Sequence, residues 1–227
     1  MNDPRPPLAG LVLAGGASRR MGTPKATLRL GERSFLEIAL TRLADAGCEP
    51  LVVVAGRDVD AVREALPPTP PAEVIVNPKP ERGQLSSLQV GLIHLTSAAG
   101  PSIGTRVQGV LVSLIDQPTI RDETFVAVAR RMRDLLAGHG PGDDRLAVCL
   151  AITPGVGRGH PVGLFRVVWP DVLGLDAQAP GGLRNLMQRL GEQVIEVPVD
   201  DPAIRRDVDT PADLARLVAE AEADERP

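Results

Sequence analysis

The sequence is poor in aromatic residues and has no excess of positive charge. Phe, Trp and Tyr make up 2% of its 227 residues, tyrosine is absent, and the net charge is −4. The scarcity of aromatic rings argues against a surface that binds single-stranded nucleic acid by base stacking. Without a general basic field, any anion must be bound by a local cluster of basic side chains. We therefore expect no nucleic-acid partner.

The sequence also lacks a long apolar run and a signal peptide. No stretch approaches the roughly 20 apolar residues that span a bilayer, and the first ten residues, MNDPRPPLAG, show no charged-then-apolar pattern. The two cysteines, Cys48 and Cys149, are far apart and have no metal-ligand spacing. This favours a reduced pair over a disulfide. These absences predict a cytoplasmic protein with no membrane partner.

What the sequence does have is an alternation of short apolar runs and amphipathic segments. Apolar runs without polar alternation predict strands that are buried on both faces. They occupy residues 8–14, 51–55, 73–76, 110–114, 146–152 and 194–197. Apolar residues at helical spacing predict helices. These occupy residues 34–46, 59–66, 86–96, 122–136 and 211–222. For the last helix, Thr210 and Asp213 form a capping-box pattern around Pro211. Residues 153–161, TPGVGRGHP, are expected to form a glycine-rich connection.

This alternation predicts right-handed β-α-β units and a parallel sheet. The length is sufficient to bury a full core without metals or disulfides, and neither a repeat nor a long linker divides the chain. We expect a single three-layer α/β/α domain over residues 1–227, Rossmann-like and with a mostly parallel sheet. Residues 1–7 and 223–227 are expected to be disordered tails.

Residues 11–28, LVLAGGASRRMGTPKATL, place glycines and cations at the end of the first predicted strand. Ligands bind at the carboxyl ends of strands in doubly wound sheets. Gly15 and Gly16 let backbone N–H groups approach a phosphate, and Arg20 and Lys25 supply charge for its oxygens. The alternative is an ordinary tight turn with solvated cations. The P-loop string and the GxGxxG fingerprint are both absent, which disfavours an NAD-dependent oxidoreductase.

The stretch LAGGASRRMGTPKATLRLGERSFLE closely resembles a family signature that runs roughly LAGGxSxRMGxxKxLLxxxGxxxL. Further matches follow in the family's order: NPKPERGQLSSLQVGL at 77–92, LIDQP at 114–118, GRGHPVGLF at 157–165 and DVDTPADL at 207–214. Over nearly its whole length the chain is similar to the molybdenum cofactor nucleotidyltransferases, the MobA/MocA-like NTP transferases. It looks most like the molybdenum cofactor cytidylyltransferases.

The resemblance implies nucleotidyl transfer, in which a phosphorylated acceptor attacks the α-phosphate of a nucleoside triphosphate and pyrophosphate leaves. It implies that Arg20 and Lys25 are the catalytic residues, holding the triphosphate. It assigns nucleotide binding to Leu13, Ala14, Gly15, Gly16, Ala17, Ser18, Asn77, Gly83 and Ser87. We expect His160 and Arg184 to bind the acceptor. A structural role is the alternative for several of these, because Asn-Pro marks turns and Ser is a favoured N-cap.

Asp116 directly follows a predicted buried strand, so its carboxylate emerges at the same sheet edge as the glycines. Mg²⁺ prefers oxygen ligands and often shares a carboxylate with substrate phosphates. The resemblance implies Asp209 as the second ligand, and the nearby Asp207 is an alternative that stays open. Both could instead be capping or solvated acids. The expected cofactor is Mg²⁺.

The donor base and the acceptor stay open at this stage. The GHPV segment resembles the cytidylyltransferases and implies CTP with molybdopterin, whereas the double glycine containing Gly15 resembles the guanylyltransferases and implies GTP. We favour CTP slightly. The resemblance also implies a molybdoenzyme as partner. The alternatives are a sugar-1-phosphate acceptor on the same fold, or a non-catalytic carrier, which would have no need of a pair of metal ligands.

Overall fold

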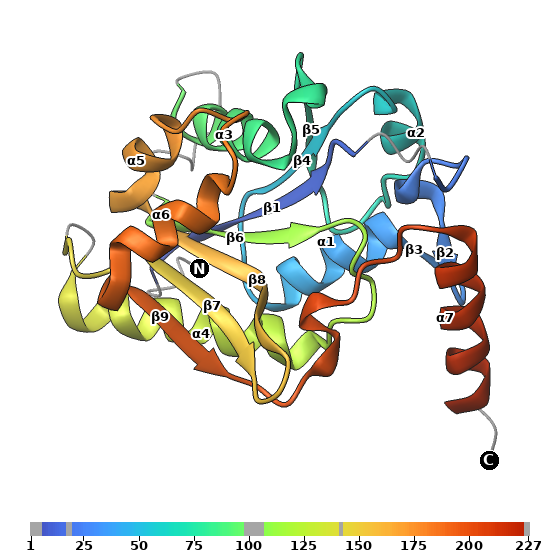
Figure 1. The fold of residues 1–227 in the computed structure, drawn as a ribbon. Coiled ribbons are helices and arrows are strands. Elements are labelled where there is room, and N and C mark those ends of the chain that lie inside the picture. Colours follow the sequence, from blue (N-terminus) through green and yellow to red (C-terminus); the bar gives the residue numbers. More distant parts are fainter. Residues whose placement is uncertain (1–5, 17–19, 98–106, 141–142, 225–227) are drawn as a thin grey trace.

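A seven-stranded sheet forms the centre of the protein. The computed structural model describes residues 6–16, 20–97, 107–140 and 143–224. The strand order is β5-β4-β1-β6-β8-β7-β9 (Figure 1). The strands are β1 (Leu8–Ala14), β4 (Leu51–Ala55), β5 (Glu73–Val76), β6 (Gly109–Leu114), β7 (Val148–Thr153), β8 (Gly157–Phe165) and β9 (Val194–Pro198). Strand β8 is antiparallel to its neighbours β6 and β7, and the other pairings are parallel. The sheet is therefore mostly parallel, as predicted. A separate hairpin joins β2 (Arg29–Leu30) and β3 (Arg33–Ser34).

Helices cover both faces of the sheet (Figure 1). The helices are α1 (Phe35–Asp45), α2 (Val59–Glu64), α3 (Gln84–Thr96), α4 (Asp122–His139), α5 (Trp169–Leu173), α6 (Gly182–Leu190) and α7 (Pro211–Asp224). Of these, α7 lies beside the β2–β3 hairpin rather than over the sheet (Figure 1). Alternate residues of β1 enter two different cores, as strand geometry requires. Leu8 and Val12 join a core with α1 and α4, whereas Leu11 and Leu13 join a core with α3, α5 and α6. The result is the expected three-layer α/β/α architecture.

One expected connection is a strand. Residues 157–161 do not form a loop but the first half of β8, in which Gly159 pairs with Ala151. This half contains Arg, His and Gly, so it has no apolar run by which it could be recognised. A Cβ atom at position 159 would collide with the backbone of Ile204. This glycine therefore serves close packing rather than a turn.

Parts of both expected tails are ordered. The carbonyl of Pro7 accepts a hydrogen bond from the Gln108 N–H (2.9 Å), and α7 continues to Asp224. Residues 1–5 and 225–227 lie outside the described part. Cys48 and Cys149 are buried free thiols, and burial raises the pKa of each to about 12. Over the residues that the structure describes, no helix has the length and apolar character needed to cross a membrane.

Candidate active site

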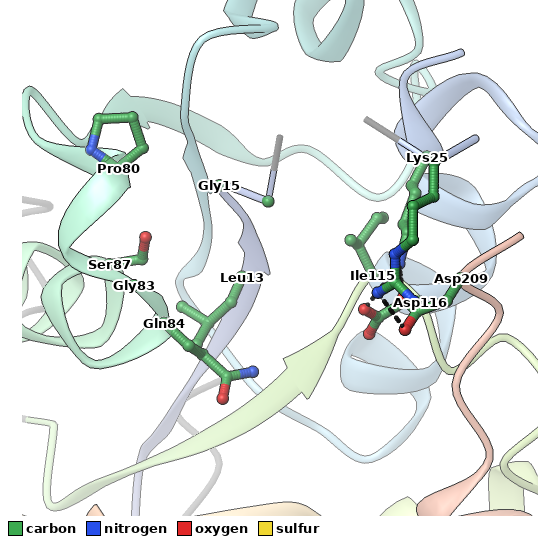
Figure 2. Close-up of a pocket in the computed structure, with 12 residues that line it drawn as sticks. Leu13, Gly15, Lys25, Pro80, Gly83, Gln84, Ser87, Ile115, Asp116 and Asp209 are labelled. Atoms are coloured by element: carbon green, nitrogen blue, oxygen red, sulfur yellow. Dashed lines mark hydrogen bonds and ion pairs between the residues drawn. The ribbon is translucent and has the colours of Figure 1, made fainter. Parts of the chain in front are cut away.

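The carboxyl ends of β1 and β6 open into a cleft of about 440 Å³. In Figure 2, the turn at Gly15 lies between two groups of residues. On one side are Pro80, Gly83, Gln84 and Ser87, at and before the start of α3, and on the other are Lys25, Asp116 and Asp209. Leu13, Gly16, Arg20 and Ile115 complete the lining. Most of the predicted site residues are thus brought together around one cleft.

A cluster of charges occupies one end of the cleft. The Lys25 ammonium donates hydrogen bonds to Asp116 Oδ2 (3.0 Å) and Asp209 Oδ1 (2.6 Å), and the Arg20 guanidinium donates to Asp209 Oδ2 (2.8 Å). Burial by itself lowers the pKa of Lys25, but the hydrogen bonds and charges of Asp209 and Asp116 outweigh it and raise the pKa. The hydrogen bond from Lys25 is the main reason that the pKa of Asp209 is lowered. Both groups are therefore charged at neutral pH.

Asp209 is held at the cleft by the start of α7. The Asp213 carboxylate accepts hydrogen bonds from the N–H groups of Asp209 (3.3 Å) and Thr210 (2.9 Å), and the Asp213 N–H donates to Thr210 Oγ1 (3.2 Å). This is the predicted capping box. The Val208 N–H also donates to the Asp116 carbonyl (2.8 Å). Two distant segments are joined in this way, and their carboxylates meet at Lys25.

Asp207 does not belong to the cleft lining. Its Oδ1 accepts a hydrogen bond from Gln117 Nε2 (2.7 Å). Burial and the negative charges of Asp116 and Asp209 raise the pKa of Asp207, and the bond from Gln117 opposes that rise. Of the two candidate acids, it is Asp209 that faces Asp116 across Lys25.

The predicted nucleotide-binding residues divide into lining and supporting groups. Leu13, Gly15, Gly16, Gly83 and Ser87 line the cleft, whereas Ala14 and Asn77 are buried beside it. Ala17 and Ser18 lie outside the described residues.

Asn77 supports Ser87 rather than lining the cleft. Its Nδ2 donates to Ser86 Oγ (2.8 Å) and Ser87 Oγ (3.0 Å). On the far side of Ser87, a Cβ atom at position 15 would lie 2.6 Å from Ser87 Oγ. Only glycine fits at position 15 unless Ser87 moves.

A second cavity of about 430 Å³ adjoins the first and shares Leu13 and Gln84 with it. His160 and Arg184, the two residues predicted to bind the acceptor, both contribute to its wall. Burial lowers the pKa of His160 to about 4, although a hydrogen bond with the Val112 backbone and the charge of Asp116 act in the opposite direction. His160 is therefore neutral at pH 7. Arg184 lies in the first turn of α6, which begins at residue 182.

The donor set fits a hard divalent cation. The described residues contain no group of three or more His, Cys, Asp or Glu side chains placed to hold a metal. The two predicted ligands, Asp116 and Asp209, would therefore need oxygens from a substrate or water to complete a coordination sphere. Both accept hydrogen bonds from a single nitrogen, Lys25 Nζ, and thus face one point. Mg²⁺ is commonly held by one or two carboxylates together with substrate phosphates and waters.

Sequence reasoning missed two glutamines at the site. Gln84 lines both cavities, and Gln117 contacts Asp207. Gln84 was not predicted as a site residue because α3 begins two residues before the expected helix. Gln117 stands next to Asp116 in LIDQP, and this adjacency was the signal that could have found it.

Glycines, two cations and two carboxylates around a cleft at the carboxyl ends of parallel strands are typical of proteins that bind phosphate groups. The comparisons identify the family. Residues 10–195 match the model of the MobA-like NTP transferase domain. The chain belongs to the MobA-like NTP transferase family, and the enzymes of this family are nucleotidyltransferases.

Proteins similar to this chain are named for different activities. The chain is 30% identical to "Nicotine blue oxidoreductase" of Paenarthrobacter nicotinovorans, over 94% of this chain and 97% of the relative. It is 28% identical to "Probable molybdenum cofactor guanylyltransferase" of Rhodopirellula baltica, over 92% and 90%. Among solved structures, Rv0371c of Mycobacterium tuberculosis shares 29% identity with a TM-score of 0.71, covering 96% of this chain and 100% of that one. Another structure of Rv0371c is a complex with manganese (26% identity, TM-score 0.69, coverage 95% and 99%).

Proposed function

We propose that this protein transfers a nucleoside monophosphate from a nucleoside triphosphate to a phosphorylated small molecule and releases pyrophosphate. The observation that carries the proposal is the charge cluster of Lys25, Arg20, Asp116 and Asp209 beside the glycine turn. An acceptor phosphate oxygen would attack the α-phosphorus as the bond to the β-phosphate bridging oxygen breaks. The acceptor phosphate is already ionised, so the reaction needs no general base.

In this proposal the protein contributes position and charge. Lys25 and Arg20 would bind phosphate oxygens and stabilise the charge of the departing pyrophosphate. Backbone N–H groups at Gly15 and Gly16 would contact other phosphate oxygens. Asp116 and Asp209 would hold Mg²⁺, which when bound neutralises phosphate charge.

The second cavity supports an acceptor with an apolar body. Its walls include the side chains of Leu85, Leu88, Val112, Val162, Leu183 and Met187. Neutral His160 and cationic Arg184 are polar groups of this wall, and Arg184 suits a phosphate. A planar heterocycle can pack its ring faces against these apolar side chains and turn its polar edge to Gln84, His160 and Arg184, whereas a sugar carries hydroxyl groups all round its ring. We therefore favour a heterocyclic acceptor such as molybdopterin over a sugar-1-phosphate. A molybdoenzyme that receives the product is the proposed partner.

CTP and GTP are the two proposed donors. The GHPV segment around His160 supports CTP, the base that the sequence slightly favours. Gly15 and the similarity to a guanylyltransferase support GTP. Because Gly15 lies close to Ser87, any side chain at position 15 would touch the α3 side of the cleft.

The test is pyrophosphate release with each of CTP, GTP, UTP and ATP, with Mg²⁺ and either molybdopterin or a panel of sugar-1-phosphates. We expect release with CTP or GTP and molybdopterin, and loss of at least about 100-fold in the Asp116→Asn protein. Binding of each triphosphate is measured in parallel by thermal shift. Triphosphate binding without release under any condition would support a carrier instead.

An oxidoreductase is a second candidate, favoured by the 30% identity to nicotine blue oxidoreductase. The missing GxGxxG fingerprint opposes it. Oxidation of NADH or NADPH in the presence of quinonoid electron acceptors, followed at 340 nm, separates the two candidates. We expect no activity in this assay.

A further inference from the structure

Asp116 and Asp209 belong to two segments that are linked by a pair of hydrogen bonds just outside the cleft. The Val208 N–H donates to the Asp116 carbonyl (2.8 Å), and Gln117 Nε2 donates to Asp207 Oδ1 (2.7 Å). The residues of the second bond are 90 positions apart in the sequence. The two bonds flank the carboxylates that meet at Lys25.

The Gln117 side chain is constrained to this contact. Gln117 is only 6% exposed, and its Oε1 is buried without a hydrogen-bond partner in the described part of the chain. An unpaired buried acceptor is unfavourable. Turning the amide over would not help, because it would set Oε1 against the Asp207 carboxylate. The contact with Asp207 therefore dictates the orientation of the amide.

The contact between Gln117 and Asp207 affects the position of Asp209 through Val208, the one residue between the two acids. Val208 is 1% exposed and packs in the core that contains α1 and α4, so it fixes the chain between the two acids. Asp207 is held by Gln117 on one side of Val208. On the other side Asp209 projects to Lys25 and Arg20.

We propose that Gln117 is a positioning residue, which acts through Asp207 and the Val208 backbone to hold the Asp209 carboxylate opposite Asp116. The inference rests on the proposed function, in which these two carboxylates hold a divalent cation. It also assigns distinct roles to the two neighbouring acids. Asp209 binds the cation. Asp207 accepts the hydrogen bond from Gln117, and this bond fixes the position of Asp209.

The test is the affinity for Mn²⁺ alone, measured from the electron paramagnetic resonance signal of the free ion. Gln117→Met has nearly the same shape without the donor, and Asp207→Leu removes the acceptor. Each variant should weaken Mn²⁺ binding about 10-fold, as loss of a group that orients a metal ligand does. The double variant should bind no more weakly than either single variant, because both remove one interaction.

Asp207→Asn is the variant that separates the roles of the two acids. An asparagine retains Oδ1, which can still accept from Gln117 Nε2, so Mn²⁺ affinity should stay within about threefold of wild type. Asp209→Asn should lose far more. The matched control is Gln193→Met, which removes a similar single bond from Gln193 Nε2 to the Asp144 carbonyl (2.6 Å) and should leave Mn²⁺ affinity unchanged. Circular dichroism verifies that each variant is folded.

Unchanged Mn²⁺ affinity in folded Gln117→Met protein overturns the positioning role. A loss in Asp207→Asn as large as that in Asp209→Asn also overturns it, since Asp207 would then be a direct ligand. Both results leave the proposed function intact. Wild-type protein that binds no Mn²⁺ overturns the metal role of Asp209 and this inference together.

Discussion

Replacing Lys25 with methionine should have opposite effects on the two proposed ligands of the cleft. The Lys25 ammonium lies between Asp116 Oδ2 (3.0 Å) and Asp209 Oδ1 (2.6 Å). A divalent cation that binds both carboxylates must displace this ammonium. A triphosphate, by contrast, should bind more tightly when this ammonium is present. Lys25→Met should therefore tighten metal binding when no nucleotide is added and weaken nucleotide binding.

The magnitude follows from the contacts of Lys25. A hydrogen bond between charged groups contributes about 1.5–3 kcal/mol. Because the Asp116 and Asp209 side chains are 26% and 34% exposed, we count both bonds together as about 1.5–3 kcal/mol after allowing for solvent screening. This corresponds to an increase in metal affinity of about 10- to 150-fold. The affinity for CTP or GTP should fall by a similar factor, and the rate of pyrophosphate release by about 100- to 1,000-fold.

Isothermal titration calorimetry with Mg²⁺ alone, and then with each nucleotide, measures both effects. The matched control is Lys79→Met, because Lys79 is the only other lysine of the chain, is exposed, and does not line the cleft. It should change neither affinity. Metal affinity that is unchanged or weaker in Lys25→Met would refute the reasoning that Lys25 competes with a cation for the two carboxylates.

Three further predictions concern single residues of the site. Gly15→Ala forces Ser87 to move, so it should lower stability by about 1–3 kcal/mol in thermal unfolding and raise the ratio of CTP to GTP affinity. Gln84→Leu removes a polar group that both cavities share; the turnover rate should fall about 10-fold with NTP affinity nearly unchanged, whereas exposed Gln188→Leu should behave as wild type. The lowered pKa of Asp209 means that its stabilising contribution is present above the unfolded pKa of about 3.9 and is lost as the pH falls through the folded value. Asp209→Asn should therefore show a shallower loss of melting temperature than wild type below about pH 5.

Local patterns in the sequence were sufficient to predict most of the fold. The run at β4, LVVVA, is buried at every position, as expected for a strand with helices on both faces. The capping box at Thr210 is equally local, and the structure contains it. The first half of β8 has no such local signal. Only Gly157, Arg158 and Gly159 of this half pair with β7, and the register shifts before Val162 resumes the pairing. Gly159 is required by the nearby Ile204 backbone.

The candidate site, too, could be predicted only in part from the sequence. Motif resemblance pointed to Lys25, Asp116 and Asp209 separately, and the strand ends predicted that Asp116 shares one edge of the sheet with the glycine stretch. The contact of Gln117 with Asp207 could not be read from spacing, because it depends on how two segments 90 residues apart pack. The support of Ser87 by Asn77 was missed for another reason. The Asn-Pro and Ser signals at these positions are those of ordinary turns and helix caps.

The charge balance of the cluster explains how such a site can fold and still bind strongly charged ligands. Arg20 and Lys25 oppose Asp116 and Asp209, so the four groups together are close to neutral, and each has a partner of opposite sign. Partly buried charges without partners would be costly. A triphosphate and a divalent cation carry the two signs that the cluster already contains. Binding them can therefore exchange each internal ion pair for one with a ligand, which leaves no charge of the site unpaired before or after binding.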